Sequence, residues 1–275
     1  MQHVKRKLLI AIALLLWSAA SLAAHDLFLK LDSYFMKPES SVRVHVLNGT
    51  FTTSSGSVAR ARLRDISLVG PKGRSQLDTT AWTSSGDSST LTLRLDDPGT
   101  YVIGASVHPR TLRLEAKDFN QYLAEDGIPD VLAARRRKGE LDRPAHERYS
   151  KHVKALVQVG DRRTDGVDTP LGYPAELIAL DNPYRLRPGA ALRVRAVVDG
   201  APVADQLVLA GGHSPVGKPF RVSRVRTDTS GVARIVLRSR GVWYVKFIRM
   251  RAVGATASDS VDYESKWATL TFAVR

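Results

Sequence analysis

Hydrophobic and polar residues alternate in short runs along most of the chain, which is typical of β-strands that bury one face. The clearest run covers residues 41–47, where Val42, Val44 and Val46 would face a core and the residues between them would face solvent. Turn-forming sequences separate such runs, for example the Asp-Asp-Pro-Gly sequence at 96–99. The pattern therefore predicts a mainly β protein.

The predicted strands fall into two groups, which indicates two β-sandwich modules. The N-terminal module occupies residues 24–115, and its runs are 27–31, 41–47, 64–69, 90–95 and 100–108. The C-terminal module occupies residues 174–275, and its runs are 176–180, 191–198, 203–209, 220–226, 232–237, 242–250 and 267–274. Seven short strands at this spacing predict an immunoglobulin-like or transthyretin-like sandwich, with Trp243 and Trp267 in its core. The polar stretch 160–173 is expected to be a linker.

Between the two modules, residues 116–159 show helical spacing and predict a helical insert. Phe119, Tyr122 and Leu123 would share one helical face, and Gly127 follows as a stop signal. A second short helix is expected to begin near Pro129, with four basic residues in its last turn, where they suit the negative end of the helix dipole.

The third predicted helix of the insert covers residues 142–159. Asp142 can cap it and Pro144 fits its first turn. Apolar residues would then form one stripe along it, made by Tyr149, Val153, Leu156 and Val157.

The N-terminus has the features of a secretory signal peptide, residues 1–23. Three basic residues precede an apolar run at 8–17, and Ser21 and Ala23 are the small residues at positions −3 and −1 of the cleavage site. Cleavage after Ala23 leaves Ala24-His25 at the mature start, whereas cleavage after Ala24 would expose His25 itself. We therefore expect a periplasmic protein, and no later run is apolar enough to span a membrane after the leader is removed.

Composition narrows the possible chemistry. The chain has no cysteine, so thiol chemistry and cysteine-based zinc sites are excluded. The leader holds three of the 41 Lys and Arg residues and none of the 27 Asp and Glu residues, so the mature chain keeps a formal charge of +11. These charges are scattered along strand faces with few aromatics among them, which favours a basic surface facing an anionic envelope over nucleic-acid binding.

Enzyme signatures are missing from the sequence. It contains no nucleophile elbow, no His-Glu-x-x-His motif, no phosphate-binding glycine loop and no dinucleotide fingerprint. We therefore expect a protein that is not an enzyme.

The mature start carries the candidate chemistry. With Ala24 first, the α-amine, the amide nitrogen of His25 and its imidazole can chelate one metal ion in a plane, which suits Ni²⁺ or Cu²⁺. With His25 first, its amine and imidazole would form a two-nitrogen copper site instead. Asp26 could orient His25 as a hydrogen-bonding partner. The alternative is that His25 only begins the first strand.

A planar site of three nitrogens needs a fourth ligand, for which His108 and His152 are the candidates because both adjoin the predicted helical insert. His152 also lies on the predicted apolar stripe, where a hydrogen-bonded core histidine is the common structural explanation. Each histidine alone is more often structural than a metal ligand.

Five segments carry a resemblance that covers nearly the whole mature chain. They are Ala24-His25-Asp26-Leu27-Phe28-Leu29, the stretch 149–156, Thr227-Asp228 with Gly231, Gly241-Val242-Trp243-Tyr244, and the stretch 264–272. Together they resemble a bacterial periplasmic family of unknown function that is commonly labelled the periplasmic component of nickel or cobalt uptake transporters. That component also has a histidine at its second mature position. The resemblance implies a divalent metal (Ni, Co or Cu) as ligand and an inner-membrane transporter or outer-membrane receptor as partner.

Three hypotheses follow from these observations. The first is a periplasmic protein that binds a divalent transition metal or its complex for uptake. The second is an envelope scaffold or adhesion protein in which the sandwiches only make protein or glycan contacts. The third is a copper-binding oxidative site on an exposed His25.

Overall fold

The computed structural model describes residues 25–253 and 261–275, and within them the chain is mainly β, as the pattern predicts. The predicted leader, Ala24 and residues 254–260 lie outside the described residues. The strands form three sheets, two small ones and one that runs through the whole molecule.

The N-terminal sheet has four strands, in the order β1 (Asp26–Leu31), β3 (Ser40–Gly49), β7 (Ser88–Leu95) and β6 (Trp82–Ser85). The C-terminal sheet is formed by β11 (Ala175–Ala179), β12 (Ala191–Val198), β13 (Ala201–Pro202) and β16 (Val232–Val236). Short 3₁₀ turns at Arg60–Arg62, Thr79–Ala81 and Pro183–Arg185 connect strands.

The central sheet has ten strands. In spatial order its main path is β15 (Ser223–Arg226), β14 (Leu207–His213), β17 (Gly241–Ala252), β18 (Tyr263–Val274), β10 (Ala145–Val159), β8 (Gly99–Val107), β4 (Leu63–Gly70) and β5 (Gly73–Gln76). The remaining two, β2 (Phe35–Met36) and β9 (Arg110–Leu114), pair with β10. Strands from both predicted modules therefore share one sheet.

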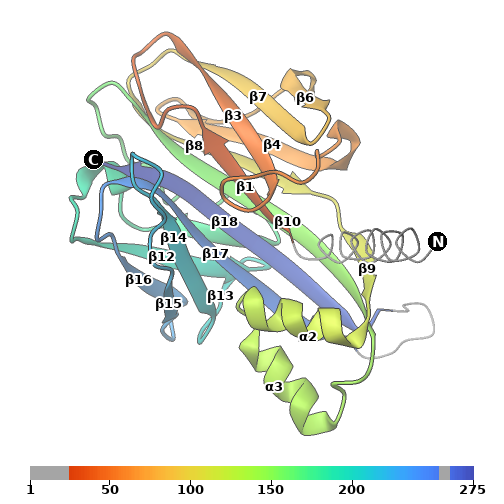
Figure 1. Ribbon diagram of the computed structural model, residues 1–275. Coiled ribbons are helices and arrows are strands. Elements are labelled where there is room, and N and C mark those ends of the chain that lie inside the picture. The colour runs from red at the N-terminus through yellow and green to blue at the C-terminus, as the bar shows by residue number, and fades with distance from the viewer. Residues whose placement is uncertain (1–24, 254–260) are drawn as a thin grey trace, which may run out of the picture.

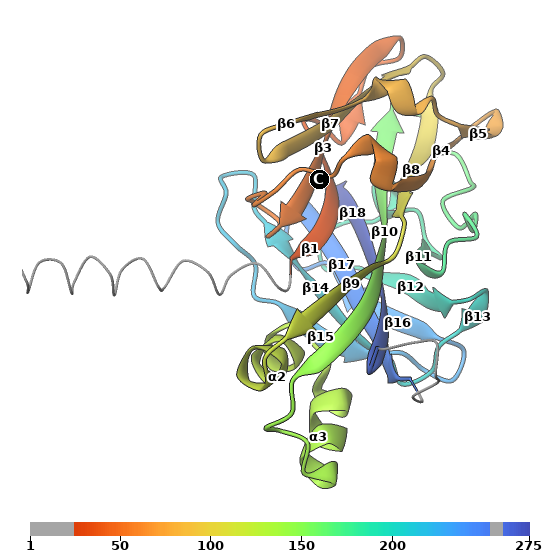
Figure 2. The same ribbon diagram turned by 90° about the vertical axis from the view of Figure 1, so that its right-hand side faces the viewer.

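The two small sheets cover opposite sides of the central sheet. Side chains alternate along β10, so Val153, Ala155 and Val157 pack against the N-terminal sheet, while Leu156 packs against the C-terminal sheet. We call these the β1 side and the β11 side of the central sheet. Each small sheet buries one apolar core against it, which gives the sandwich-like layers of Figures 1 and 2.

The first two predicted helices are confirmed as α2 (Ala116–Glu125) and α3 (Pro129–Lys138). They pack on the β1 side, over the ends of β17 and β18, where a third core includes Ile248 and Trp267. Gly139 ends α3 in the left-handed region, with φ 68°. The basic last turn is not all solvated, because Arg135 turns inward and donates to Tyr263 and to the carbonyl oxygens of Glu140 and Arg143.

The prediction of a third helix over residues 142–159 is wrong, since this segment is the strand β10. It runs parallel to β18 and antiparallel to β8 and β9. Both sides of β10 are covered, so its apolar residues do not alternate with exposed polar ones and the period of two is lost from the sequence. The apparent helical stripe of Tyr149, Val153 and Leu156 mixes residues from opposite sides of the sheet.

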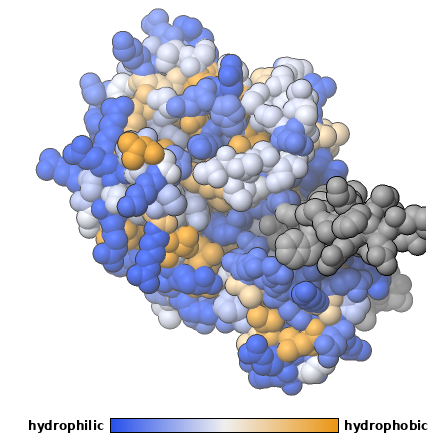
Figure 3. Space-filling model, in the orientation of Figure 1, coloured by the Kyte–Doolittle hydropathy of each residue, from blue (hydrophilic) through white to orange (hydrophobic). Residues whose placement is uncertain are grey.

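The prediction that Trp243 and Trp267 are buried is confirmed, with each 4% exposed. Figure 3 shows a mainly hydrophilic surface with separate hydrophobic patches, one of them on the lobe that α2 and α3 form. Among the described residues, no helix has the length and apolar character that a membrane span requires.

Candidate functional site

On the β1 side of the central sheet, three buried charges meet between β1 and α2. Lys246 of β17 forms an ion pair with Asp26, the first residue of β1. Its ammonium also lies 3.0 Å from a carboxylate oxygen of Asp126, the residue that caps the C-terminus of α2. Burial alone would lower the pKa of Lys246, but the two carboxylates outweigh it and raise this pKa, so the ammonium stays charged. Burial raises the pKa of Asp126, and Lys246 opposes that rise. This triad fixes the start of β1 to the sheet and to the helices.

A second lysine holds the residue before β1. Lys151 of β10 donates a hydrogen bond to the carbonyl oxygen of His25, and its ammonium lies 4.9 Å from the ring centre of Trp267 and 5.2 Å from that of Tyr149. Burial lowers the pKa of Lys151 to about 8. His25 is half-buried. The backbone at His25 is therefore fixed on the body of the protein.

Two buried polar atoms in this neighbourhood have no hydrogen-bond partner within residues 25–253 and 261–275: Oδ1 of Asp26 and Nε of Arg62. Both side chains influence the charge of Lys151. Burial lowers the pKa of Arg62, and the charge of Arg110 adds to this effect. Because buried polar groups are almost always paired, these two atoms mark a place where a ligand would gain contacts.

A buried glutamate lies behind this layer. Glu147 accepts hydrogen bonds from Tyr122, at 3.1 Å, and from Ser265. Burial raises its pKa to about 7. The N-terminal polar cluster thus consists of His25, Asp26, Arg62, Asp126, Glu147, Lys151 and Lys246.

The N-terminal polar cluster offers one imidazole and a carboxylate oxygen with spare hydrogen-bonding capacity. Within residues 25–253 and 261–275, however, no group of three or more His, Asp or Glu side chains is arranged to hold a metal ion. A metal site at His25 therefore needs ligand atoms beyond those of the described side chains.

A family model described as "Domain of unknown function (DUF4198)" matches residues 22–251. The chain belongs to this family. A search of curated proteins found no match. The resemblance to a family of unknown function is thus confirmed, and the nickel or cobalt label stays a hypothesis.

Solved structures similar to this DUF4198 chain include an adhesin, InvE, from Yersinia pseudotuberculosis, with 13% identity over 90% of this chain and 58% of that one, and a TM-score of 0.22. A segment of Escherichia coli alpha-2-macroglobulin spanning domains MG0-NIE-MG1 has 11% identity, covers 93% and 73% of the two chains and has a TM-score of 0.24. Two fibronectin type-III domains of chicken tenascin have 12% identity, 87% and 95% coverage and a TM-score of 0.19.

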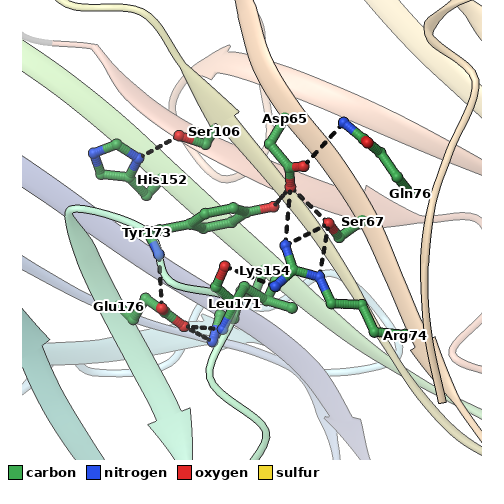
Figure 4. Close-up of polar contacts among 10 residues, drawn as sticks. All are labelled: Asp65, Ser67, Arg74, Gln76, Ser106, His152, Lys154, Leu171, Tyr173 and Glu176. Atoms are coloured by element: carbon green, nitrogen blue, oxygen red, sulfur yellow. Dashed lines mark hydrogen bonds and ion pairs between the residues drawn. The ribbon is translucent and has the colours of Figure 1, made fainter. Parts of the chain in front are cut away.

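The structure places His152 away from His25. His152 lies on the β11 side, one residue along β10 from Lys151, and one of its ring nitrogens lies 2.8 Å from Ser106 Oγ (Figure 4). The other ring nitrogen lies 3.0 Å from Ser150 Oγ. Burial lowers its pKa to about 3. It has the surroundings of a core histidine. His108 is exposed just after β8. Its backbone N–H donates a hydrogen bond to the carbonyl oxygen of Arg62, and the Arg62 guanidinium donates one to the carbonyl oxygen of His108.

Of the predicted site residues, the structure brings His25 and Asp26 together with the N-terminal polar cluster. It does not bring His152 to them. Sequence reasoning missed the two buried lysines and Asp126. The sequence does contain a signal for Lys246, which is the one charged residue in the apolar run 242–248. A lysine in a buried strand is almost always paired, so this position predicts a partner elsewhere in the chain.

Proposed function

We propose that this protein is an exported, non-catalytic binding protein for a divalent transition metal ion, nickel, cobalt or copper, or for a complex of such an ion. It would deliver the metal in the periplasm to an inner-membrane transporter or an outer-membrane receptor. One observation carries the proposal: His25 and Asp26 are fixed in the N-terminal polar cluster, where Asp26 keeps a buried carboxylate oxygen that has no partner among the described residues.

The proposal is supported by the chemistry of the segment Ala24-His25-Asp26. After export, the α-amine, the amide nitrogen of His25 and the imidazole would supply nitrogen ligands, and Asp26 adds negative charge beside them. Lys151 is a nearby positive charge that opposes a bound cation. Because its pKa is already lowered to about 8, it can lose its proton at modest cost when a cation binds.

An envelope scaffold or adhesion protein is the second candidate. The observation that favours it is the lack of a three-residue metal-binding group within the described part of the chain. A copper-binding oxidative site is the third, and it requires His25 to be the first residue of the mature protein.

Titration calorimetry with Ni²⁺, Co²⁺ and Cu²⁺ tests the proposal, on periplasmic protein whose first residue is verified by mass spectrometry. We expect one ion per chain and an affinity that rises steeply with pH, since the amine, amide and imidazole all lose protons. His25→Ala, or acetylation of the α-amine, should each weaken binding about 100-fold or more, because even outer-shell changes cost about 10–100-fold.

The control is His45→Ala. His45 is a partly exposed histidine that bonds to Asp32 at 2.6 Å, so its loss should not change the affinity. If acetylated protein binds Ni²⁺ and Cu²⁺ as tightly as the free protein, the N-terminal site does not exist, and the scaffold becomes the better account.

A further inference from the structure

The β11 side of the central sheet carries a cleft beyond the edge of the C-terminal sheet. It consists of two adjoining cavities of about 420 and 330 Å³, which share Asp199, Glu264 and Lys266. Sites for small ligands usually measure about 300–1,000 Å³. The N-terminal polar cluster lies on the other side of the sheet, so this cleft is a separate feature.

Strand register gathers basic side chains along the floor of the cleft. Arg148, Glu264 and Arg251 stand opposite one another on β10, β18 and β17. Two residues further along β18, Lys266 stands opposite Arg249. Residues two apart on a strand point to the same side, so both rows face the cleft. Arg64 lies on β4, where the strand register shifts between Leu63 and Asp65, and it is the fifth cationic side chain that lines the cleft.

The cations of the cleft outnumber its carboxylates. Glu264 forms an ion pair with Arg148 at 3.5 Å, and one of its carboxylate oxygens accepts a hydrogen bond from Arg251. Asp199 forms an ion pair with Lys266 at 2.6 Å. Arg64 and Arg249 form no ion pair with any described residue. Among the described lining residues, five cationic side chains therefore face two carboxylates, an excess of three positive charges.

We propose that this cleft binds an anion that carries several phosphoryl groups. Guanidinium groups present paired N–H donors that match the oxygen atoms of a phosphate. The cations are spread from β17 to β4, four strand positions or roughly 15–20 Å apart, which exceeds the reach of one phosphate. A wall formed by Val198, Ala201 and Val203 suits the apolar part of an organic ligand.

Asp199 limits access to the site. It lies in a two-residue Asp-Gly turn between β12 and β13, in the left-handed region with φ 51°. This turn holds its carboxylate against Lys266. The Asp199 side chain is 61% exposed, so the ion pair is weak and a phosphoryl group can displace it.

Calorimetric titration of sodium tripolyphosphate into metal-free mature protein at 0.15 M salt tests the proposal. Arg64→Ala combined with Arg249→Ala should weaken binding at least about tenfold, the loss of one charge-assisted contact. Asp199→Asn should tighten binding, because asparagine keeps the left-handed turn and releases Lys266. The matched control is Arg224→Ala, which removes an exposed arginine of the edge strand β15.

Two results would overturn the proposal. One is the absence of saturable tripolyphosphate binding. The other is an equal loss of affinity in the Arg224→Ala control, which would show binding to the general basic charge. Vesicles containing phosphatidylglycerol identify the source of the phosphoryl groups: if the protein binds vesicles but not tripolyphosphate, the basic residues serve a membrane surface and the cleft is not a ligand site. Circular dichroism confirms that each variant is folded.

Discussion

Lys151 and Lys154 lie three residues apart on β10, and each is almost completely buried, with 8% and 3% of its surface exposed. They point to opposite sides of the central sheet. Lys154 forms an ion pair with Glu176, which also accepts the backbone N–H groups of Leu171 and Tyr173 (Figure 4). Lys151 has a carbonyl oxygen and two aromatic rings, but no carboxylate paired with it in the described residues.

Among the described residues, no buried side-chain atom of the network around Lys154 lacks a hydrogen-bond partner. Tyr173 donates to Asp65 at 2.6 Å, and Arg74 donates to Ser67 and to the carbonyl oxygen of Leu171. These bonds tie β4 and β5 to the segment that leads into β11, so they join the N-terminal and C-terminal parts of the fold. A fully satisfied network of this kind rigidifies a protein.

The N-terminal polar cluster around Lys151 differs because two of its buried atoms have no partner in the part of the chain that the structure describes. Burial of a lysine therefore does not by itself identify a site. What distinguishes the two lysine networks is whether their buried polar atoms have partners among the described residues, and of the two only the cluster around Lys151 keeps unpaired buried atoms.

The largest expected difference comes from making the same substitution at both lysines. Lys154→Met leaves the Glu176 carboxylate buried without its cation and should lower the free energy of unfolding by about 3–5 kcal/mol. Lys151→Met leaves no carboxylate without its ion-pair partner and should change the free energy of unfolding by less than about 1 kcal/mol. Urea denaturation measures both. Equal losses would show that the two regions do not differ as described.

The next effect is a pH dependence that belongs to the β1 side. The pKa of Glu147 is raised from 4.5 to about 7, so between these values the folded state binds more protons than the unfolded state. Stability contributed by this group therefore falls as pH rises from 4.5 to 7, by roughly 3 kcal/mol in total.

Glu147→Gln cannot titrate and should lack that fall. The measurement is the difference in unfolding free energy between wild type and Glu147→Gln across pH 4 to 8. If the two stability curves run parallel through that interval, Glu147 is ionised in the folded state and our account of its burial is wrong.

The smallest effect concerns the two histidines proposed as further metal ligands. His152 lies on the β11 side with both ring nitrogens beside serine hydroxyls, so His152→Gln should leave the affinity for Ni²⁺ and Cu²⁺ within about twofold of wild type. Calorimetry on the His108→Ala variant, run under the same conditions, tests whether the exposed His108 contributes to the metal affinity. A large loss in His152→Gln would mean that the metal site is on the other side of the sheet.

Much of the local structure was predictable from residue order. Alternation predicted β3, helical spacing and glycine stop signals predicted α2 and α3, and the apolar, aromatic-containing run 242–250 predicted β17. The adjacency of His25 and Asp26 also needs only the sequence, because neighbours in sequence are neighbours in space.

Only the tertiary structure decided that residues 145–159 form a strand, because a strand covered on both sides loses the period of two that identifies it. It also decided that His152 faces away from His25, and that Lys246, 220 residues after Asp26, pairs with it. Such contacts depend on which strands become neighbours in the central sheet. Long-range pairing sets that order, and it leaves no local pattern in the sequence.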